Sequence, residues 1–179
     1  HGRAACLLRR ALAFDGQAPC PQQIAPADRC EAATGAAVAV KTPFISETLT
    51  AEHSAEAFSC GQPALDVWLR TSALHAQSMR TARTFIWHRG DRAVVAFFSL
   101  AAHVVRRGEV PARVGRGSPD AIPAVLLARL ALDTRLHGEG LGAELLWDAL
   151  SRAVAAADAA GARLVVVDAI DDAAASFYS

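Results

Sequence analysis

The most regular pattern of hydrophobic positions lies in the C-terminal third of the chain. Between residues 141 and 160 apolar side chains recur every four positions, which predicts one long amphipathic helix, and Gly161 is placed to end it. The runs at residues 126 to 133 and 164 to 170 are almost continuously apolar, as expected of strands buried on both faces. A strand, a helix and a strand in this order predict a parallel pair with a right-handed crossover.

The preceding part of the chain predicts an antiparallel meander with one helix. Gly90 and Asp91 mark a tight turn between two strand-like runs, and Pro63 is a favourable first helical residue. The expected elements are strands at residues 44 to 50, 84 to 88 and 93 to 101, a helix from residue 63 to 76, an arginine- and glycine-rich loop at 106 to 120, and a final short helix at 173 to 178. The predicted fold class is therefore α/β, with a mixed central sheet flanked by helices.

The domain organisation follows from where this periodicity begins. Residues 1 to 40 show no sustained pattern and do not begin with methionine, so we expect a disordered or non-native extension followed by one domain at residues 41 to 179. The four cysteines have no paired C-x-x-C spacing, which argues against a metal site and for a reduced, cytoplasmic chain. No apolar run of about 18 residues predicts a membrane span.

Arginine is concentrated in one part of a chain whose formal net charge is zero. Residues 67 to 116 hold nine arginines against two carboxylates, whereas residues 117 to 179 hold four arginines against nine carboxylates. A basic segment of this kind is suited to phosphate contacts with a nucleic acid. The alternative is a solvated arginine-rich surface from a GC-rich genome, and the presence of a single lysine, Lys41, favours that alternative.

A glycine-rich turn links the strand that ends at Asp133 to the long helix. Its three glycines allow consecutive backbone N–H groups to converge on an anion, and the helix start adds unpaired N–H groups and the positive end of its dipole. The alternative is a plain loop at a helix start. The spacing Arg135-x-x-Gly138-x-Gly140 resembles the acyl-coenzyme A (CoA) signature of the GNAT superfamily of N-acetyltransferases.

Further motifs resemble the GNAT toxins of bacterial toxin–antitoxin pairs over about residues 44 to 179. In chain order they are Cys60-Gly61, Leu65-Asp66-x-Trp68-Leu69, Phe98-Ser99-Leu100-Ala101, the segment from Leu127 to Asp133, Gly140-Leu141-Gly142 and Phe177-Tyr178. The resemblance implies a GNAT fold and transfer of acetyl from acetyl-CoA to the α-amino group of aminoacyl-tRNA, which blocks translation. It also implies a ribbon-helix-helix antitoxin as partner, and a homodimer is a further possibility.

The same resemblance assigns roles to particular residues. Leu130, Ala131 and Leu132 would hold the pantetheine arm, and the pyrophosphate would lie against Arg135, His137, Gly138, Glu139, Gly140, Leu141 and Gly142. Tyr178, the only tyrosine, would donate a proton to the leaving sulfur, with a core aromatic role as the alternative. We predict no catalytic base, because an α-amino group with a pKa of about 7.7 to 8.0 is partly neutral at cellular pH.

The remaining expectations concern the acceptor and the end of the domain. We expect RNA contacts from some of Arg70, Arg80, Arg83, Arg89, Arg92, Arg106 and Arg107, and surface or core roles for His53, His75, His88 and His103. The family pattern continues beyond its Phe-Tyr pair into one or two more strands, so we expect a C-terminally truncated sheet here. Alternative functions are a GNAT that acetylates a small amine or a protein amino group, and a non-catalytic acyl-CoA-binding module.

Overall fold

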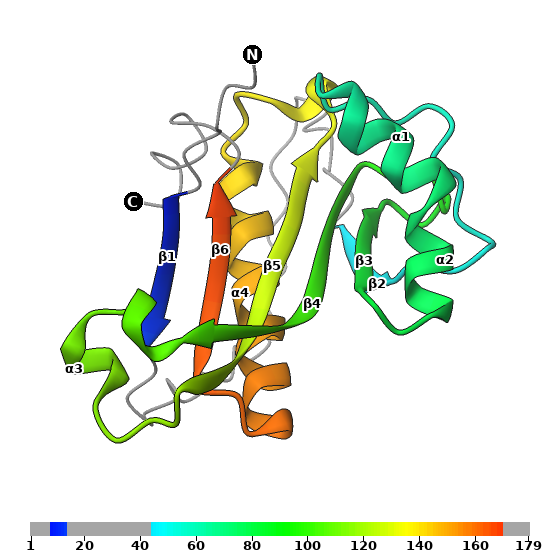
Figure 1. The fold of residues 1–179 in the computed structure, drawn as a ribbon. Coiled ribbons are helices and arrows are strands. Elements are labelled where there is room, and N and C mark those ends of the chain that lie inside the picture. Colours follow the sequence, from blue (N-terminus) through cyan, green and yellow to red (C-terminus); the bar gives the residue numbers. More distant parts are fainter. Residues whose placement is uncertain (1–7, 14–43, 170–179) are drawn as a thin grey trace, which may run out of the picture.

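The computed structural model describes residues 8–13 and 44–169, which form a six-stranded mixed sheet with helices on both faces (Figure 1). The strand order is β1-β6-β5-β4-β3-β2. The strands are β1 (Leu8–Ala13), β2 (Ile45–Thr48), β3 (Arg83–His88), β4 (Ala96–Arg106), β5 (Ala121–Leu132) and β6 (Leu164–Ala169). The helices are α1 (Pro63–Thr71), α2 (Ala73–Ser78), α3 (Ala112–Gly115) and α4 (Leu141–Ala160), with short 3₁₀ turns η1 (Arg107–Glu109) and η2 (Thr134–Leu136).

The sheet topology confirms the predicted meander and crossover. Strands β2, β3, β4 and β5 pair antiparallel in sequence order. Strands β5 and β6, which α4 connects in the sequence, pair parallel. Strand β1 pairs antiparallel with β6, so six residues of the segment for which we predicted an unstructured extension form an edge strand. No helix among the described residues combines the length and apolar character that a bilayer crossing requires.

Three local features differ from the sequence-based expectation. The predicted helix from Pro63 is interrupted at Ser72, which separates α1 from α2. The second hairpin strand extends to Arg106, beyond the predicted end at residue 101. The following loop contains η1 and α3, because Val114 packs into a small core with β4, β5 and β6. The predicted final helix at 173–178 lies outside the described residues.

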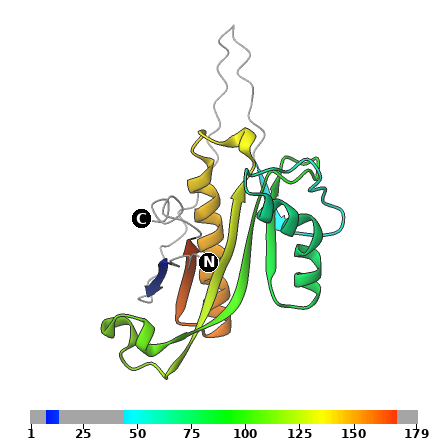
Figure 2. The ribbon, with the colours of Figure 1, turned by 45° about the horizontal axis from the view of Figure 1, so that its top comes forward.

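Helix α4 lies on one face of the sheet and helices α1 and α2 lie on the other (Figure 2), and a hydrophobic core holds the helices on each face. Helix α4 buries Leu145, Ala149, Ala153 and Ala157 against β4, β5 and β6, as the four-residue periodicity predicts. On the other face, α1 and α2 pack on Ile86, Phe97 and Ala131 through the side chains Leu65, Trp68, Leu69 and Ala73. The inner strands are therefore covered on both sides, which explains their almost continuously apolar sequence.

An irregularity in β5 separates the strand from β6. Ser99 pairs with Arg129 and Leu100 pairs with Leu127, so Ala128 is an extra residue, a β-bulge. The parallel pairing of β5 with β6 runs from Ala124 to Leu127 and ends there, within the described residues. Beyond the bulge, β5 continues to Leu132 without β6 as a partner. Among the described residues, this divergence leaves one edge of β5 without a partner strand next to the start of α4.

Candidate functional site

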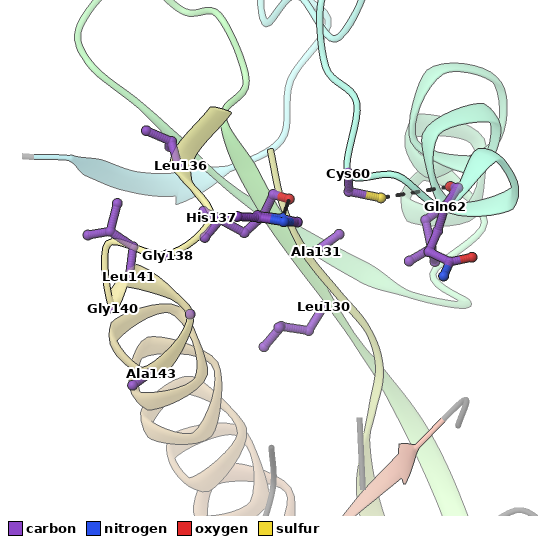
Figure 3. Close-up of a pocket in the computed structure, with 13 residues that line it drawn as sticks. Cys60, Gln62, Leu130, Ala131, Leu136, His137, Gly138, Gly140, Leu141 and Ala143 are labelled. Carbon is purple, nitrogen blue, oxygen red and sulfur yellow. Dashed lines mark hydrogen bonds between the residues drawn. The ribbon is translucent and has the colours of Figure 1, made fainter. Parts of the chain in front are cut away.

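A cavity of about 540 Å³ lies at the place where β5 leaves β6 (Figure 3). Its size falls within the range of small-molecule sites, about 300 to 1,000 Å³. Figure 3 shows the glycine turn and the start of α4 on one side of β5, and Cys60 and Gln62 on the other. The lining residues are Cys60, Gln62, Leu65, Leu130, Ala131, Leu132, Leu136, His137, Gly138, Gly140, Leu141, Gly142 and Ala143.

The first wall of the cavity is the glycine turn and the amino end of α4. Gly138 and Gly140 have φ values of 81° and 78°, in the left-handed region that favours glycine. Gly140 is the N-cap of α4, and as a glycine it has no side chain with which to cap the helix. The Ala143 N–H donates to the carbonyl of Gly140 at 3.2 Å, which leaves the N–H groups of Leu141 and Gly142 and the positive end of the helix dipole beside the cavity. Such an arrangement binds phosphate.

His137 connects this turn to the end of β5. Its Nε2 lies 2.9 Å from the carbonyl oxygen of Leu132, so Nε2 carries the proton and donates it. The hydrogen bond connects the turn to the end of the strand, and the exposed imidazole lines the cavity. The role of His137 seen here is to shape the turn through a side-chain hydrogen bond.

The second wall is the loop before α1, which is organised by the buried carboxylate of Asp66. The backbone N–H of Cys60 donates to Asp66 at 2.9 Å, and the hydroxyl of Ser59 donates at 3.2 Å. Burial alone would raise the pKa of Asp66, but these hydrogen bonds and the charge of Arg70 hold it below its usual value. The first-turn carboxylate thus fixes the loop that carries Cys60 into the cavity.

The Cys60 thiol is a neutral group in this wall. Burial, followed by the hydrogen-bonded Asp66 carboxylate, raises its pKa to about 11. A thiol with this pKa is protonated at neutral pH, and the thiolate is the nucleophilic form. Cys60 therefore contributes shape and a weakly polar surface to this wall.

Asp133 joins the two walls. Its carboxylate is 1% exposed and accepts Arg135 Nε and Nη2, each at 2.8 Å, as well as the Ser59 N–H at 3.3 Å. The hydrogen bonds from the Arg135 side chain are the main cause that lowers the pKa of Asp133 to about 2. Thr134 N–H also donates to Ser59 O at 2.9 Å. The strand end, η2 and the loop before α1 consequently form one hydrogen-bonded unit.

Most of the residues predicted for cofactor binding meet at this cavity. Leu130, Ala131, Leu132, His137, Gly138, Gly140, Leu141 and Gly142 line it. Arg135 does not, because its guanidinium is held by Asp133, and Glu139 is also absent from the lining. Tyr178 lies outside the described residues. Sequence reasoning missed Cys60, Gln62, Leu65, Leu136 and Ala143, of which only Cys60 and Leu65 stood in a quoted motif.

The arginines predicted to contact RNA are spread over several elements. Arg92 pairs with Glu52, Arg107 pairs with Asp120, Arg70 donates to the carbonyl of Phe58, and Arg89 lies over the Phe44 ring. Arg80 and Arg83 line a separate cavity of about 300 Å³ beside the end of α4, and Arg106 is exposed at the end of β4. None of the seven lines the cavity beside the glycine turn. They offer a dispersed basic surface.

Glu47, His53 and His88 form a compact group away from this cavity. Their ligand-type atoms lie within 4.8 Å of one another. The Nδ1 atoms of His53 and His88 accept backbone N–H groups at 3.0 Å, so both rings carry their proton on Nε2 and donate it to Glu47. These hydrogen bonds, His53 first, hold the pKa of Glu47 below its usual value. A metal would require the opposite tautomers, so the donor set fits a hydrogen-bonded triad.

Comparison with known proteins identifies relatives of this arrangement. The chain is 45% identical over 121 residues to a tRNA-acetylating toxin of Mycobacterium tuberculosis, which covers 68% of this chain and 72% of the relative. A solved structure of AtaT complexed with acetyl-methionyl-tRNAfMet has a TM-score of 0.71 and 30% identity, over 76% of this chain and 84% of AtaT. No protein-family profile matches the chain.

A second AtaT structure contains the donor substrate and a partner. It is a tyrosine-to-phenylalanine variant bound to the C-terminus of the antitoxin AtaR and acetyl-CoA. Its TM-score is 0.63 at 30% identity, over 76% of this chain and 81% of that protein. The identity to the mycobacterial toxin and the shared fold establish the family. The chain belongs to the tRNA-acetylating GNAT toxins of bacterial toxin–antitoxin systems.

Proposed function

We propose that this protein transfers the acetyl group of acetyl-CoA to the α-amino group of an aminoacyl-tRNA and thereby blocks translation. The observation that carries the proposal is the cavity between the diverging strand β5 and the uncapped start of α4, in a chain that belongs to this toxin family. The similar AtaT structures contain the acetylated aminoacyl-tRNA in one case and acetyl-CoA in another.

The residues of the first wall fit the chemistry of acetyl-CoA. The N–H groups of the glycine turn and α4 suit a pyrophosphate. The edge of β5 beyond Leu127, which no strand in the described ranges pairs with, suits the amide groups of a pantetheine arm. We infer that Leu130, Ala131 and Leu132 hold the arm and that His137, Gly138, Gly140, Leu141 and Gly142 surround the pyrophosphate. Arg135 would act indirectly, by fixing Asp133 and η2.

The reaction needs little from the protein beyond orientation and a proton donor. The acetyl thioester supplies an activated acyl group. The neutral α-amino group attacks the carbonyl carbon and a C–N bond forms. The nitrogen then releases one proton to water, the C–S bond breaks, and the sulfur leaves with the electron pair and accepts a proton. An α-amino pKa of about 7.7 to 8.0 means that a strong base is unnecessary. We propose Tyr178 as the donor of the proton to the sulfur.

The partners follow from the same assignment. We propose that part of the dispersed arginine surface, including Arg80, Arg83 and Arg106, contacts the RNA backbone of the substrate, in the cytoplasm where charged tRNA occurs. The AtaT structure that contains the antitoxin AtaR supports an antitoxin as a partner, and we propose that this antitoxin is of the ribbon-helix-helix type. A homodimer is compatible with this assignment.

A labelled-acetyl assay tests the function directly. The purified protein is incubated with labelled acetyl-CoA and a mixture of charged and uncharged tRNAs, and the labelled product is separated after mild ester hydrolysis. We expect label on the released amino acid as its N-acetyl derivative. Label on polyamines or peptides with none on the aminoacyl group would favour the small-amine alternative. Saturable acetyl-CoA binding without turnover would favour a non-catalytic binding module.

The Tyr178→Phe variant tests the proton donor. Since general acid catalysis typically contributes about 10²- to 10⁴-fold, we expect kcat to fall by at least a hundredfold while the Kd for acetyl-CoA changes less than twofold. Transfer rate and acetyl-CoA binding are measured on the same preparation. Equal loss of both would show that the tyrosine is structural.

A further inference from the structure

Arg129 is a half-buried arginine that the assignment above does not use. It lies on β5, and its Cζ is 4.0 Å from the centroid of the Trp68 ring on α1. Trp68 is itself stacked on Phe97, at a centroid distance of 6.0 Å and an interplanar angle of 21°. Burial lowers the pKa of Arg129, although a guanidinium stays charged at neutral pH. The Arg129 guanidinium is thus partly shielded from water and lies over the Trp68 ring, which is itself held by its stacking on Phe97.

Arg152 provides a matched comparison for this environment. It is also half-buried and lies over an aromatic ring, with Cζ 4.5 Å from the Phe85 centroid. Arg152, however, donates to the Asp148 carboxylate at 3.0 Å, whereas no carboxylate in the described part of the chain pairs with Arg129. Burial of an unpaired charge is unfavourable, and a cation–π contact offsets only part of that cost. No hydrogen-bond acceptor among the described residues takes the N–H donors of Arg129, so these donors are available to a ligand.

The position of Arg129 indicates which ligand meets it. Ala131, two residues further along β5, and Leu65, one helical turn before Trp68, both line the cavity. Its contact with Trp68 places Arg129 on the α1 side of β5, and the glycine turn lies on the other side (Figure 3). Arg129 also sits at the bulge, where it pairs with Ser99 and where β5 leaves β6. Arg129 therefore borders the cavity on the side of α1.

We propose that Arg129 binds the phosphate of the terminal nucleotide of the aminoacyl-tRNA and so positions the aminoacyl group at the cavity mouth. This inference rests on the proposed function. A guanidinium offers a planar fork that matches two phosphate oxygens, and the indole underneath fixes its orientation. The phosphate nearest to an ester-linked amino acid is that of the same nucleotide, and one anion supplies the countercharge that Arg129 lacks among the described residues.

The phosphates of acetyl-CoA are a less suitable counterion for Arg129. The turn of Gly138, Gly140 and the start of α4 lies on one side of β5, and α1, the helix that contains Trp68, packs on the other side. A donor with its pyrophosphate at that site presents its thioester, at the far end of the pantetheine arm, to the edge of β5. The charge of Arg129 is consequently directed to the acceptor side.

The experiment compares acceptors with and without phosphate. Arg129→Gln, Arg129→Lys and wild type are assayed with aminoacyl-tRNA and with 3′-aminoacylamino-3′-deoxyadenosine, which keeps the α-amino group but carries no phosphate. We expect Arg129→Gln to lower kcat/KM at least tenfold for the tRNA and less than twofold for the nucleoside. Arg129→Lys should recover part of the loss, because it keeps the charge but not the fork. The slope of log Kobs against log salt for tRNA should fall by about 0.7 to 1 in Arg129→Gln.

Controls separate a local contact from other causes. Arg113→Gln removes the same charge from α3, at an exposed position away from the cavity, and should leave kcat/KM for tRNA within twofold. Equal losses on both acceptors, an unchanged salt slope, or an equal effect of Arg113→Gln would overturn the phosphate contact. A rise of the Kd for acetyl-CoA alone would assign Arg129 to the donor instead. Wild-type protein that acetylates the nucleoside but never charged tRNA would instead overturn the proposed function.

Discussion

The two walls of the cavity offer different kinds of chemical group to a ligand. The wall formed by the glycine turn and α4 presents backbone N–H groups, and its side chains serve mainly to hold the turn. The wall before and within α1 presents side chains, with Asp66 fixing the loop and Trp68 supporting Arg129. Backbone recognition depends on a few glycines at fixed spacing within one segment. Side-chain recognition depends on residues from separate segments, which meet only after folding.

Asp133 is hydrogen-bonded to both walls, so its replacement should have the largest effect of the proposed substitutions. Its replacement by asparagine removes the negative charge that accepts hydrogen bonds from the Arg135 side chain and the Ser59 N–H. Because Asp133 is buried, we expect a loss of about 2 to 4 kcal/mol in the free energy of unfolding. Denaturant unfolding measures this loss. A change below about 0.5 kcal/mol would contradict the structural role assigned here.

The same variant has a defined dependence on pH. The pKa of Asp133 is lowered to about 2 from 3.8, so its ionised form contributes stability above about pH 4, and this contribution disappears as pH falls toward 2. The contribution is about 1 to 2 kcal/mol, because Arg135 is well exposed to water. The difference between wild type and Asp133→Asn should therefore shrink between pH 4 and pH 2. A difference that stays constant over this window would exclude the ionised carboxylate as its source.

Gly140→Val tests the backbone wall alone. Valine at φ 78° is strained, since a left-handed conformation costs about 1 to 2 kcal/mol for a residue with a Cβ atom and more for a β-branched one. Relief of that strain would turn the N–H groups away from the ligand, so we expect the Kd for acetyl-CoA to rise at least tenfold. Gly90→Val is the matched control, at φ 93° with open space around it. Similar losses of affinity in both variants would point to general destabilisation.

Arg135→Ala distinguishes a direct role in cofactor binding from an indirect one. The sequence motif suggested contact with the pyrophosphate, whereas the guanidinium is 2.8 Å from both carboxylate oxygens of Asp133. We expect a loss of about 1 to 2 kcal/mol in stability, with the Kd for acetyl-CoA changed less than threefold. Isothermal titration and thermal unfolding give the two values. A Kd raised tenfold with unchanged stability would restore the direct contact.

Cys60→Ala should have the smallest effect. The thiol lines the cavity but has a pKa of about 11, so it is not a nucleophile at neutral pH. We expect acetyl transfer within twofold of wild type, and alkylation of Cys60 by iodoacetamide that becomes fast only at strongly alkaline pH. A tenfold loss of transfer would show that Cys60 takes part in the chemistry.

Sequence reasoning predicted those features that depend on local periodicity and glycine chemistry. Helix α4, its end at Gly161 and the turn around Gly138 and Gly140 follow from spacing along one segment. The bulge at Ala128 could not be predicted. Because this part of β5 is apolar on both faces of the sheet, the sequence does not show at which residue the side chains change faces. The pairing of Arg135 with Asp133 was missed for a similar reason, since an arginine before a glycine turn fits a ligand contact or an ion pair equally well.

The bulge at Ala128 also determines how far β5 and β6 can remain paired. Ala128 and Arg129 together occupy one position opposite β4, so removal of Ala128 would keep Leu127 and Leu130 on the α4 face and Arg129 and Ala131 on the other. The shortened strand could then continue its ladder with β6 beyond Leu127. Deletion of this one residue would thus let β5 and β6 stay paired along their length. The protein would keep the same core but would have no opening between the strands for an acyl donor.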